Sequence, residues 1–122
     1  MASILLVEDD DHLRTMLKSI LTNSGHEVWD VPNGTRACHL HDQQSFDLVI
    51  TDLVMPEKDG LEVIIELRRT NQDVRIIAMS GTGPGSGELY LRVAQRLGAD
   101  LTLSKPFGNQ EFLETVCLAL ET

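Results

Sequence analysis

The chain has 122 residues, of which 42% are hydrophobic and 24% charged, a balance typical of one soluble globular domain and unlike a disordered segment. Its formal net charge of −9 excludes a general attraction to nucleic acid or to an anionic membrane. No stretch approaches the roughly 20 apolar residues of a membrane span. The 2 cysteines, without a secretory signal, indicate reduced thiols in a cytoplasmic protein.

Short apolar runs alternate with stretches of helical periodicity along the whole chain. The runs, each predicted to be a buried strand, are 3–7, 27–31, 48–51, 74–79 and 101–104. A helical stretch follows each run, and the first is predicted to bury one face, formed by Leu13, Met16, Leu17, Ile20 and Leu21. Strands this apolar are covered on both faces, so the pattern predicts an α/β fold with a doubly wound parallel sheet of five strands and five helices.

Polar side chains stand at the carboxyl ends of the predicted strands, where parallel α/β sheets bind their ligands. They are Glu8, Asp9 and Asp10 after the first strand, Asp52 after the third, Ser80 after the fourth and Lys105 after the fifth. Crowded carboxylates resist ionisation unless a cation joins them, and an oxygen-only set suits a hard ion such as Mg2+. With one hydroxyl and one ammonium, the set has the parts of a phosphoryl-transfer site, in which an aspartate can itself be the nucleophile.

These polar residues also have ordinary structural explanations. An acid after a strand often only caps the next helix, and Asp10 is expected to cap the helix that begins near His12. A Ser-Gly pair after a strand is usually a turn. Glu8, Asp9 and Asp52 exceed what capping requires, so the joint occurrence of polar groups at successive strand ends favours a functional site.

Four stretches resemble the receiver domain of two-component response regulators: ILLVEDDDHLR, DLVITDLVMPEKDGLEVI, IIAMSG and GADLTLSKPF. The resemblance covers essentially all of residues 1–122 and implies a flavodoxin-like fold with strand order 2-1-3-4-5. It implies a phosphorelay in which a sensor histidine kinase or a phosphotransfer protein phosphorylates the domain, which then switches a surface for a downstream effector. The chemistry would be self-catalysed phosphotransfer with slow self-dephosphorylation, so the term enzyme stays a matter of definition.

The resemblance assigns a role to each acid, with Mg2+ or Mn2+ as the cofactor. Asp52 is expected to be the phosphoacceptor. The metal would be bound directly by Asp9, Asp52 and the backbone carbonyl of Val54. Glu8 matches the acid that reaches the metal mostly through water.

Ser80 and Lys105 are the expected catalytic partners of the phosphoacceptor. Ser80 matches the switch hydroxyl that moves to meet the phosphoryl group, and Lys105 matches the lysine that pairs with it. The resemblance also implies a cis peptide bond between Lys105 and Pro106. At the second switch position the family commonly has Tyr or Phe, whereas this chain has Thr102, so the usual aromatic signal is missing or replaced.

Two loops also depart from the family pattern. Val54 lies two residues after Asp52, where the family's side chain, with the one at Thr82, influences the placement of the hydrolytic water. Valine cannot hydrogen-bond water, so slow self-hydrolysis is predicted. Segment 81–87 is rich in Gly and Pro but lacks the Lys-Ser/Thr that ends a P-loop, and we expect it to change order on phosphorylation.

Two rival functions stay open at this point. A pseudo-receiver would act only as an interaction module, and the full set of acids, hydroxyl and lysine argues against it. An Mg2+-dependent aspartyl phosphatase or mutase usually has a second acid two residues after the nucleophile, where this chain has Val54.

Other metal-ligating side chains occur outside the strand ends. Cys38, His39, His41 and Asp42 lie on one short predicted helix, where near neighbours point in different directions, and no second cluster completes a zinc site. We expect them to be surface or partly packed residues. Cys117, beside Val116 in the last helix, is expected to be a buried core thiol.

Overall fold

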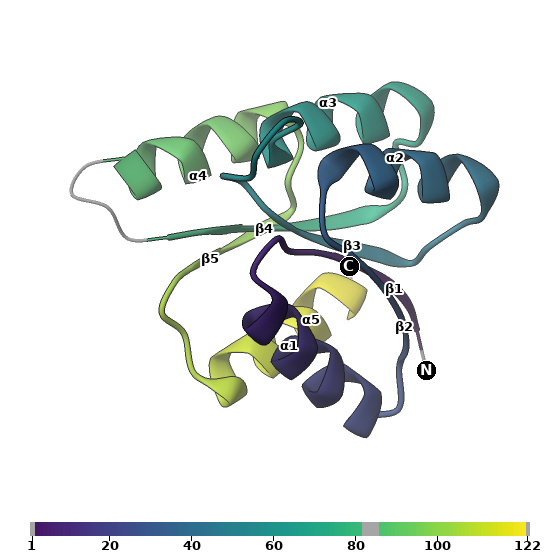
Figure 1. Cartoon of the computed structure of the whole chain (residues 1–122), viewed down its shortest axis with the longest axis vertical. Helices are drawn as coiled ribbons and strands as arrows, with labels where there is room; N and C mark the ends of the chain where they lie inside the picture. Colours follow the sequence, from purple (N-terminus) through teal and green to yellow (C-terminus); the bar gives the residue numbers. More distant parts are fainter. Residues whose placement is uncertain (1, 82–85, 122) are drawn as a thin grey trace.

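Strands and helices alternate along the chain and build a sheet between two layers of helices (Figure 1). The computed structural model describes residues 2–81 and 86–121. The strands are β1 (Ser3–Val7), β2 (Glu27–Val31), β3 (Leu48–Asp52), β4 (Arg75–Ser80) and β5 (Leu101–Ser104). The helices are α1 (Asp11–Asn23), α2 (Gly34–Gln43), α3 (Gly60–Thr70), α4 (Ser86–Leu97) and α5 (Asn109–Glu121).

The five strands are all parallel and lie in the order β2-β1-β3-β4-β5. This order confirms the predicted doubly wound, flavodoxin-like fold. The register sets Asp52 of β3 opposite Met79 of β4, and Ser80 opposite Ser104 of β5. The carboxyl ends of the inner strands therefore reach the same edge of the sheet.

Each face of the sheet has its own apolar core, because successive side chains of a strand point to opposite faces. One core contains Leu5, Val7 and Val49, together with buried residues of α2, α3 and α4. The other contains Ile4 and Ile50 with buried residues of α1 and α5. Figure 1 shows the same division, with α1 and α5 on one side of the sheet and α2, α3 and α4 on the other.

Helix ends follow the local sequence. The Asp10 side chain accepts a hydrogen bond from the N–H of Leu13 at 3.1 Å, which confirms the predicted cap of α1. Asp59 caps α3 in the same way, through the N–H of Glu62 at 3.0 Å. Because Asp59 ends the loop after β3, its cap also fastens that loop to α3.

Two predicted core positions are wrong. Met16 is 47% exposed, because α1 buries the stripe around Leu17 and Leu21, and adjacent helical residues lie about 100° apart around the axis. Cys117 is exposed for the same reason, since it directly follows the buried Val116 on α5. Among the described residues, none of the helices has the length and apolar character that crossing a membrane requires.

Candidate functional site

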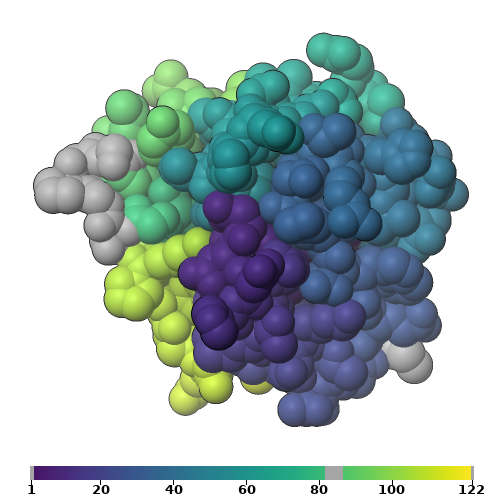
Figure 2. All heavy atoms as spheres, viewed as in Figure 1, coloured from purple at the N-terminus to yellow at the C-terminus, as the bar shows by residue number. Residues whose placement is uncertain are grey.

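The polar residues predicted from the strand ends meet at one edge of the sheet. β3 and β4 each extend one residue beyond the prediction, so Asp52 and Ser80 are the last residues of their strands. Glu8 and Lys105 directly follow β1 and β5. Figure 2 shows the segment after β1, in purple, at the surface between the blue and teal α2–α3 region and the yellow-green segment after β5.

Three carboxylates form the centre of this site. One carboxylate oxygen from each of Glu8, Asp9 and Asp52 lies within 4.8 Å of those of the other two. Glu8 is 1% exposed and Asp52 5% exposed, whereas Asp9 is exposed to solvent. An all-oxygen set with an open side fits Mg2+, which prefers oxygen ligands and keeps several waters.

Lys105 places its ammonium against two of these acids. Its Nζ lies 2.7 Å from Glu8 Oε1 and 3.3 Å from Asp52 Oδ1. Its backbone N–H donates to the carbonyl of Ser80 at 2.8 Å, which joins the ends of β5 and β4. The Lys105–Pro106 peptide bond is cis, as predicted. The lysine was expected to pair with Asp52, and the structure adds Glu8 as the nearer partner.

Burial dominates the electrostatics of the acids. It raises the pKa of Glu8 from 4.5 to about 7, with repulsion from Asp52 adding to the rise and the hydrogen bond from Lys105 opposing it. Burial likewise raises the pKa of Asp52, against the attraction of Lys105. Burial alone would lower the pKa of Lys105, but its contacts with Glu8 and Asp52 raise it. The Lys105 ammonium contacts two of the three clustered carboxylates, so a further cation would relieve the remaining repulsion among them.

Backbone contacts fix the position of Asp52. Its Oδ1 accepts a hydrogen bond from the N–H of Leu53 at 3.0 Å, and its carbonyl accepts one from Thr51 Oγ1 at 2.9 Å. The N–H of Leu53 also points to Met79 of the neighbouring strand, at 2.9 Å from its carbonyl oxygen. In the described part of the chain, both polar contacts of the Asp52 carboxylate end on Oδ1.

The remaining predicted site residues lie at the end of β4, just after β3 and within β5. Ser80 is buried, and its Oγ is 3.5 Å from the carbonyl of Gly81, at the outer limit of a hydrogen bond. The Val54 side chain is 56% exposed, between the buried Leu53 and Met55. Thr102 is partly buried in β5, opposite Ala78.

The expected change in segment 81–87 and the position of Thr82 concern residues 82–85, which lie outside the described residues.

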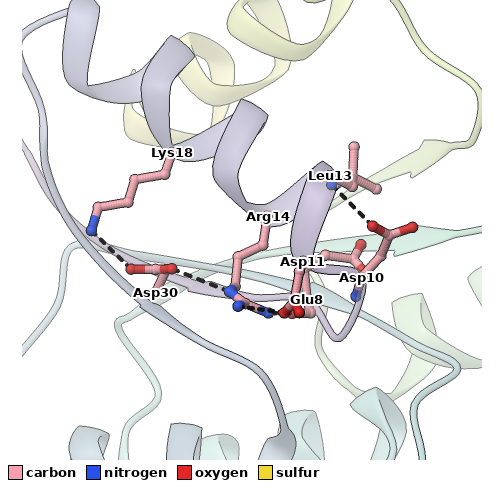
Figure 3. Close-up of polar contacts among 7 residues, drawn as sticks. All are labelled: Glu8, Asp10, Asp11, Leu13, Arg14, Lys18 and Asp30. Carbon is pink, nitrogen blue, oxygen red and sulfur yellow. Dashed lines mark hydrogen bonds and ion pairs between the residues drawn. The ribbon is translucent and has the colours of Figure 1, made fainter.

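The role of Arg14 of α1, which contacts the backbone of the site, was not predicted from the sequence. Arg14 of α1 donates to the backbone carbonyl of Glu8 at 2.9 Å and pairs with Asp30 of β2 at 3.2 Å (Figure 3). A signal was present, because Asp30 is a charged residue inside the otherwise apolar run VWDV. The hydrogen bond from Arg14 to the Glu8 carbonyl could not be predicted in this way, because every residue has a backbone carbonyl.

The second group of potential metal ligands lies on α2, and its Cys38 and His41 face α3. Cys38, His41 and Glu66 line a cavity of about 190 Å³, so Cys38 and His41 do not point in different directions as expected; they are three residues apart and share a helical face. His39 is exposed. Among the described residues, the acids at the strand ends are the only group that meets the geometry of a metal site.

The comparison with known proteins decides the family. The family described as response regulator receiver domain matches residues 4–117. The chain belongs to this family. This receiver domain is 37% identical over 116 residues to the transcriptional regulatory protein CpxR of Klebsiella pneumoniae, covering 95% of the chain and 48% of the relative. It is 36% identical over 121 residues to the DNA-binding transcriptional regulator NtrC of Azospirillum brasilense, covering 99% of the chain and 24% of the relative.

Solved structures agree with this assignment. The receiver domain of NtrX from Brucella abortus superimposes with a TM-score of 0.90 at 26% identity, covering 98% of each chain. Chemotaxis protein CheY4 of Vibrio cholerae gives a TM-score of 0.87 at 28% identity, covering 98% of this chain and 99% of that one. The chain is a receiver domain of two-component response regulators, and the match favours neither rival function. The chain spans about half the length of CpxR and about a quarter of the length of NtrC.

Proposed function

We propose that this receiver domain, taken to span residues 1–122, accepts a phosphoryl group on Asp52 from the phosphohistidine of a sensor histidine kinase or a phosphotransfer protein. The observation that supports it best is the setting of Asp52. Its carboxylate is nearly buried at the carboxyl edge of the sheet, 3.3 Å from the Lys105 ammonium and inside the acidic cluster. The Lys105 ammonium and the N–H of Leu53 both contact Oδ1 of Asp52. This orients the carboxylate so that Oδ2 can attack the phosphoryl group.

The transfer step is an in-line displacement at phosphorus. Asp52 Oδ2 forms the new O–P bond as the P–N bond to the donor histidine breaks, and the electron pair leaves on the imidazole nitrogen. Glu8, Asp9, Asp52 and the Val54 carbonyl would hold the Mg2+, which supplies charge neutralisation for the phosphoryl oxygens. Lys105 would then pair with an oxygen of the phosphoryl group on Asp52 in place of its bond to Glu8, because its Nζ already lies 3.3 Å from the Asp52 carboxylate.

The charge added at Asp52 would act on the surface through the ends of β4 and β5. Ser80 directly follows Met79, the residue that pairs with Asp52 across the sheet, and its carbonyl accepts a hydrogen bond from the N–H of Lys105. We propose that Ser80 moves toward the phosphoryl group and that Thr102, on the paired strand, transmits the change without an aromatic ring. The proposal also includes a downstream effector that binds this surface and a cytoplasmic location for the domain.

Replacing Asp52 with Asn is expected to abolish covalent phosphorylation. Wild-type protein treated with a small phosphodonor and Mg2+ should gain the mass of one phosphoryl group, whereas Asp52→Asn should gain none. Intact-protein mass spectrometry measures this directly. Asp73→Asn is the matched control, because Asp73 is exposed just before β4, at the opposite edge of the sheet. Phosphorylation of the Asp52→Asn variant would contradict the assignment, and a wild type that gains nothing would favour the pseudo-receiver.

The phosphorylated protein is expected to lose its phosphoryl group slowly, because the exposed Val54 side chain cannot orient water. Val54→Asn should shorten the lifetime severalfold in a phosphate-release assay. Val54→Ala separates the effect of polarity from that of size, because alanine is also smaller than valine but its side chain forms no hydrogen bond. Equal acceleration by both variants, or wild-type decay within seconds, would show that the side-chain polarity is not the cause.

A further inference from the structure

The guanidinium of Arg14 contacts three acceptors from three parts of the chain (Figure 3). One nitrogen donates to the backbone carbonyl of Glu8 at 2.9 Å. Nε donates to Asp30 Oδ2 on β2 at 3.2 Å, and the other nitrogen donates to Asp11 Oδ1 at 2.7 Å. The Arg14 side chain is only 16% exposed, so its geometry is set by packing as well as by these partners.

β2 contacts the N–H of Glu8 directly and its carbonyl indirectly, through Arg14 of α1, although β2 contributes no carboxylate to the site. The N–H of Glu8 donates to the carbonyl of Val31 at 3.2 Å. The carbonyl of Glu8 is bound by Arg14, which is itself oriented by Asp30, the residue before Val31. Asp30 is in turn bound by Lys18 at 2.9 Å through its other oxygen.

The peptide that Arg14 binds lies between the first two acids of the site. Its plane determines the directions in which the Glu8 and Asp9 side chains leave the backbone. Glu8 Oε2 accepts a hydrogen bond from the N–H of Asp10 at 3.1 Å, so the Glu8 side chain folds back over the same turn. Rotation of this peptide would therefore move both carboxylates relative to Asp52.

We propose that Arg14, oriented by Asp30, is a positioning residue that fixes the Glu8–Asp9 peptide so that both carboxylates converge with Asp52 on a divalent cation. This inference rests on the proposed function, because it concerns the metal that would serve Asp52. Arg14 touches no reacting atom, since its contact with the site is to the backbone carbonyl of Glu8.

The sign of the effect distinguishes positioning from simple electrostatics. Removing a positive charge beside a cation site relieves repulsion, so electrostatics alone predicts tighter Mg2+ binding without Arg14. Positioning predicts weaker binding. Groups that orient metal ligands from outside the coordination shell typically contribute about 10–100-fold to metal affinity.

The test is direct titration of the unphosphorylated protein with Mg2+ by calorimetry. Arg14→Gln is expected to weaken Mg2+ binding about 10-fold. Arg14→Lys should recover part of this loss, because an ammonium reaches one acceptor but lacks the planar fork. Lys18→Gln is the matched control, since it removes the other cation paired with Asp30 but leaves Arg14 on Glu8. At saturating Mg2+, the phosphorylation rate of Arg14→Gln should return close to that of the wild type.

Binding by Arg14→Gln as tight as, or tighter than, wild type would overturn the inference. So would a Lys18→Gln variant that is weakened as much as Arg14→Gln. If Arg14→Gln fails to fold, Arg14→Lys decides the matter, because it keeps the positive charge but lacks the planar fork that reaches Glu8 and Asp30 together, and it should still bind Mg2+ more weakly than the wild type. A wild type that binds no Mg2+ overturns both proposals, whereas one that binds Mg2+ but is not phosphorylated on Asp52 overturns the proposed function alone.

Discussion

Gly60→Ala is expected to destabilise the protein by about 3 kcal/mol or more, at or above the upper end of the usual cost of overpacking. An ideal Cβ at Gly60 would lie 2.2 Å from the carbonyl oxygen of Asp52 and 2.7 Å from Cα of Leu53. Both are backbone atoms, so no side-chain rotation relieves the clash. The N–H of Gly60 also donates to the carbonyl of Leu53 at 2.9 Å, which holds the two segments together.

The same clash acts on the site, because the displaced atoms belong to the phosphoacceptor. Moving the carbonyl of Asp52 away from α3 would shift the carboxylate that Lys105 and the N–H of Leu53 now hold. Gly60→Ala should therefore lower the phosphorylation rate of the protein that remains folded, in addition to its stability.

Urea unfolding at constant pH measures the first effect. Gly108→Ala is the matched control, since Gly108 precedes α5 and nothing lies within 4 Å of its ideal Cβ. Its free energy of unfolding should change by less than about 1 kcal/mol. A Gly60→Ala variant as stable as this control would show that the β3–α3 loop yields easily and does not hold Asp52 in place.

Much of the fold was readable because the strands are short apolar runs that end on polar residues. The runs that became β1, β2 and β5 were placed without error, β3 extends one residue further than predicted, and β4 is shifted by one residue at both ends. The errors at Met16 and Cys117 concern which side of a helix is buried. Both positions border the apolar stripe, and tertiary packing, not periodicity, sets the width of that stripe.

The carboxylates of the site could also be predicted from the sequence, because residues at the carboxyl ends of neighbouring parallel strands lie at the same edge of the sheet. The pairing of side chains within the site was harder to predict. Whether Lys105 lies nearer Glu8 or Asp52 depends on a difference of a few tenths of an ångström between two buried acids. The contact of Arg14 with the carbonyl of Glu8 requires α1 to pack over the end of β2, an arrangement that no local pattern encodes.

Glu8→Gln is expected to stabilise the metal-free protein at pH 8, although it removes a residue of the site. Burial raises the pKa of Glu8 in the folded protein to about 7, from 4.5. The folded state therefore holds this proton more tightly than the unfolded chain does. Its stabilising contribution is complete below about pH 4.5 and is lost as the pH rises from there through 7.

The size of the effect follows from the same shift. One pKa unit corresponds to about 1.4 kcal/mol, so ionising Glu8 costs the folded state on the order of 3 kcal/mol by pH 8. Glutamine has no such proton to lose. The difference in free energy of unfolding between Glu8→Gln and wild type should be small near pH 5 and should grow in favour of the variant up to pH 8.

Urea unfolding between pH 5 and 8 without divalent ions tests this, and using the difference between the two proteins cancels the titration of the histidines. Glu27→Gln is the control, because it makes the same carboxylate-to-amide change at an exposed residue at the start of β2, outside the site. Added Mg2+ should reverse the order at pH 8, since a cation that binds the folded state stabilises it through the ionised acids. A difference that does not change with pH would mean that Glu8 is already ionised at pH 5, with Lys105 offsetting its burial.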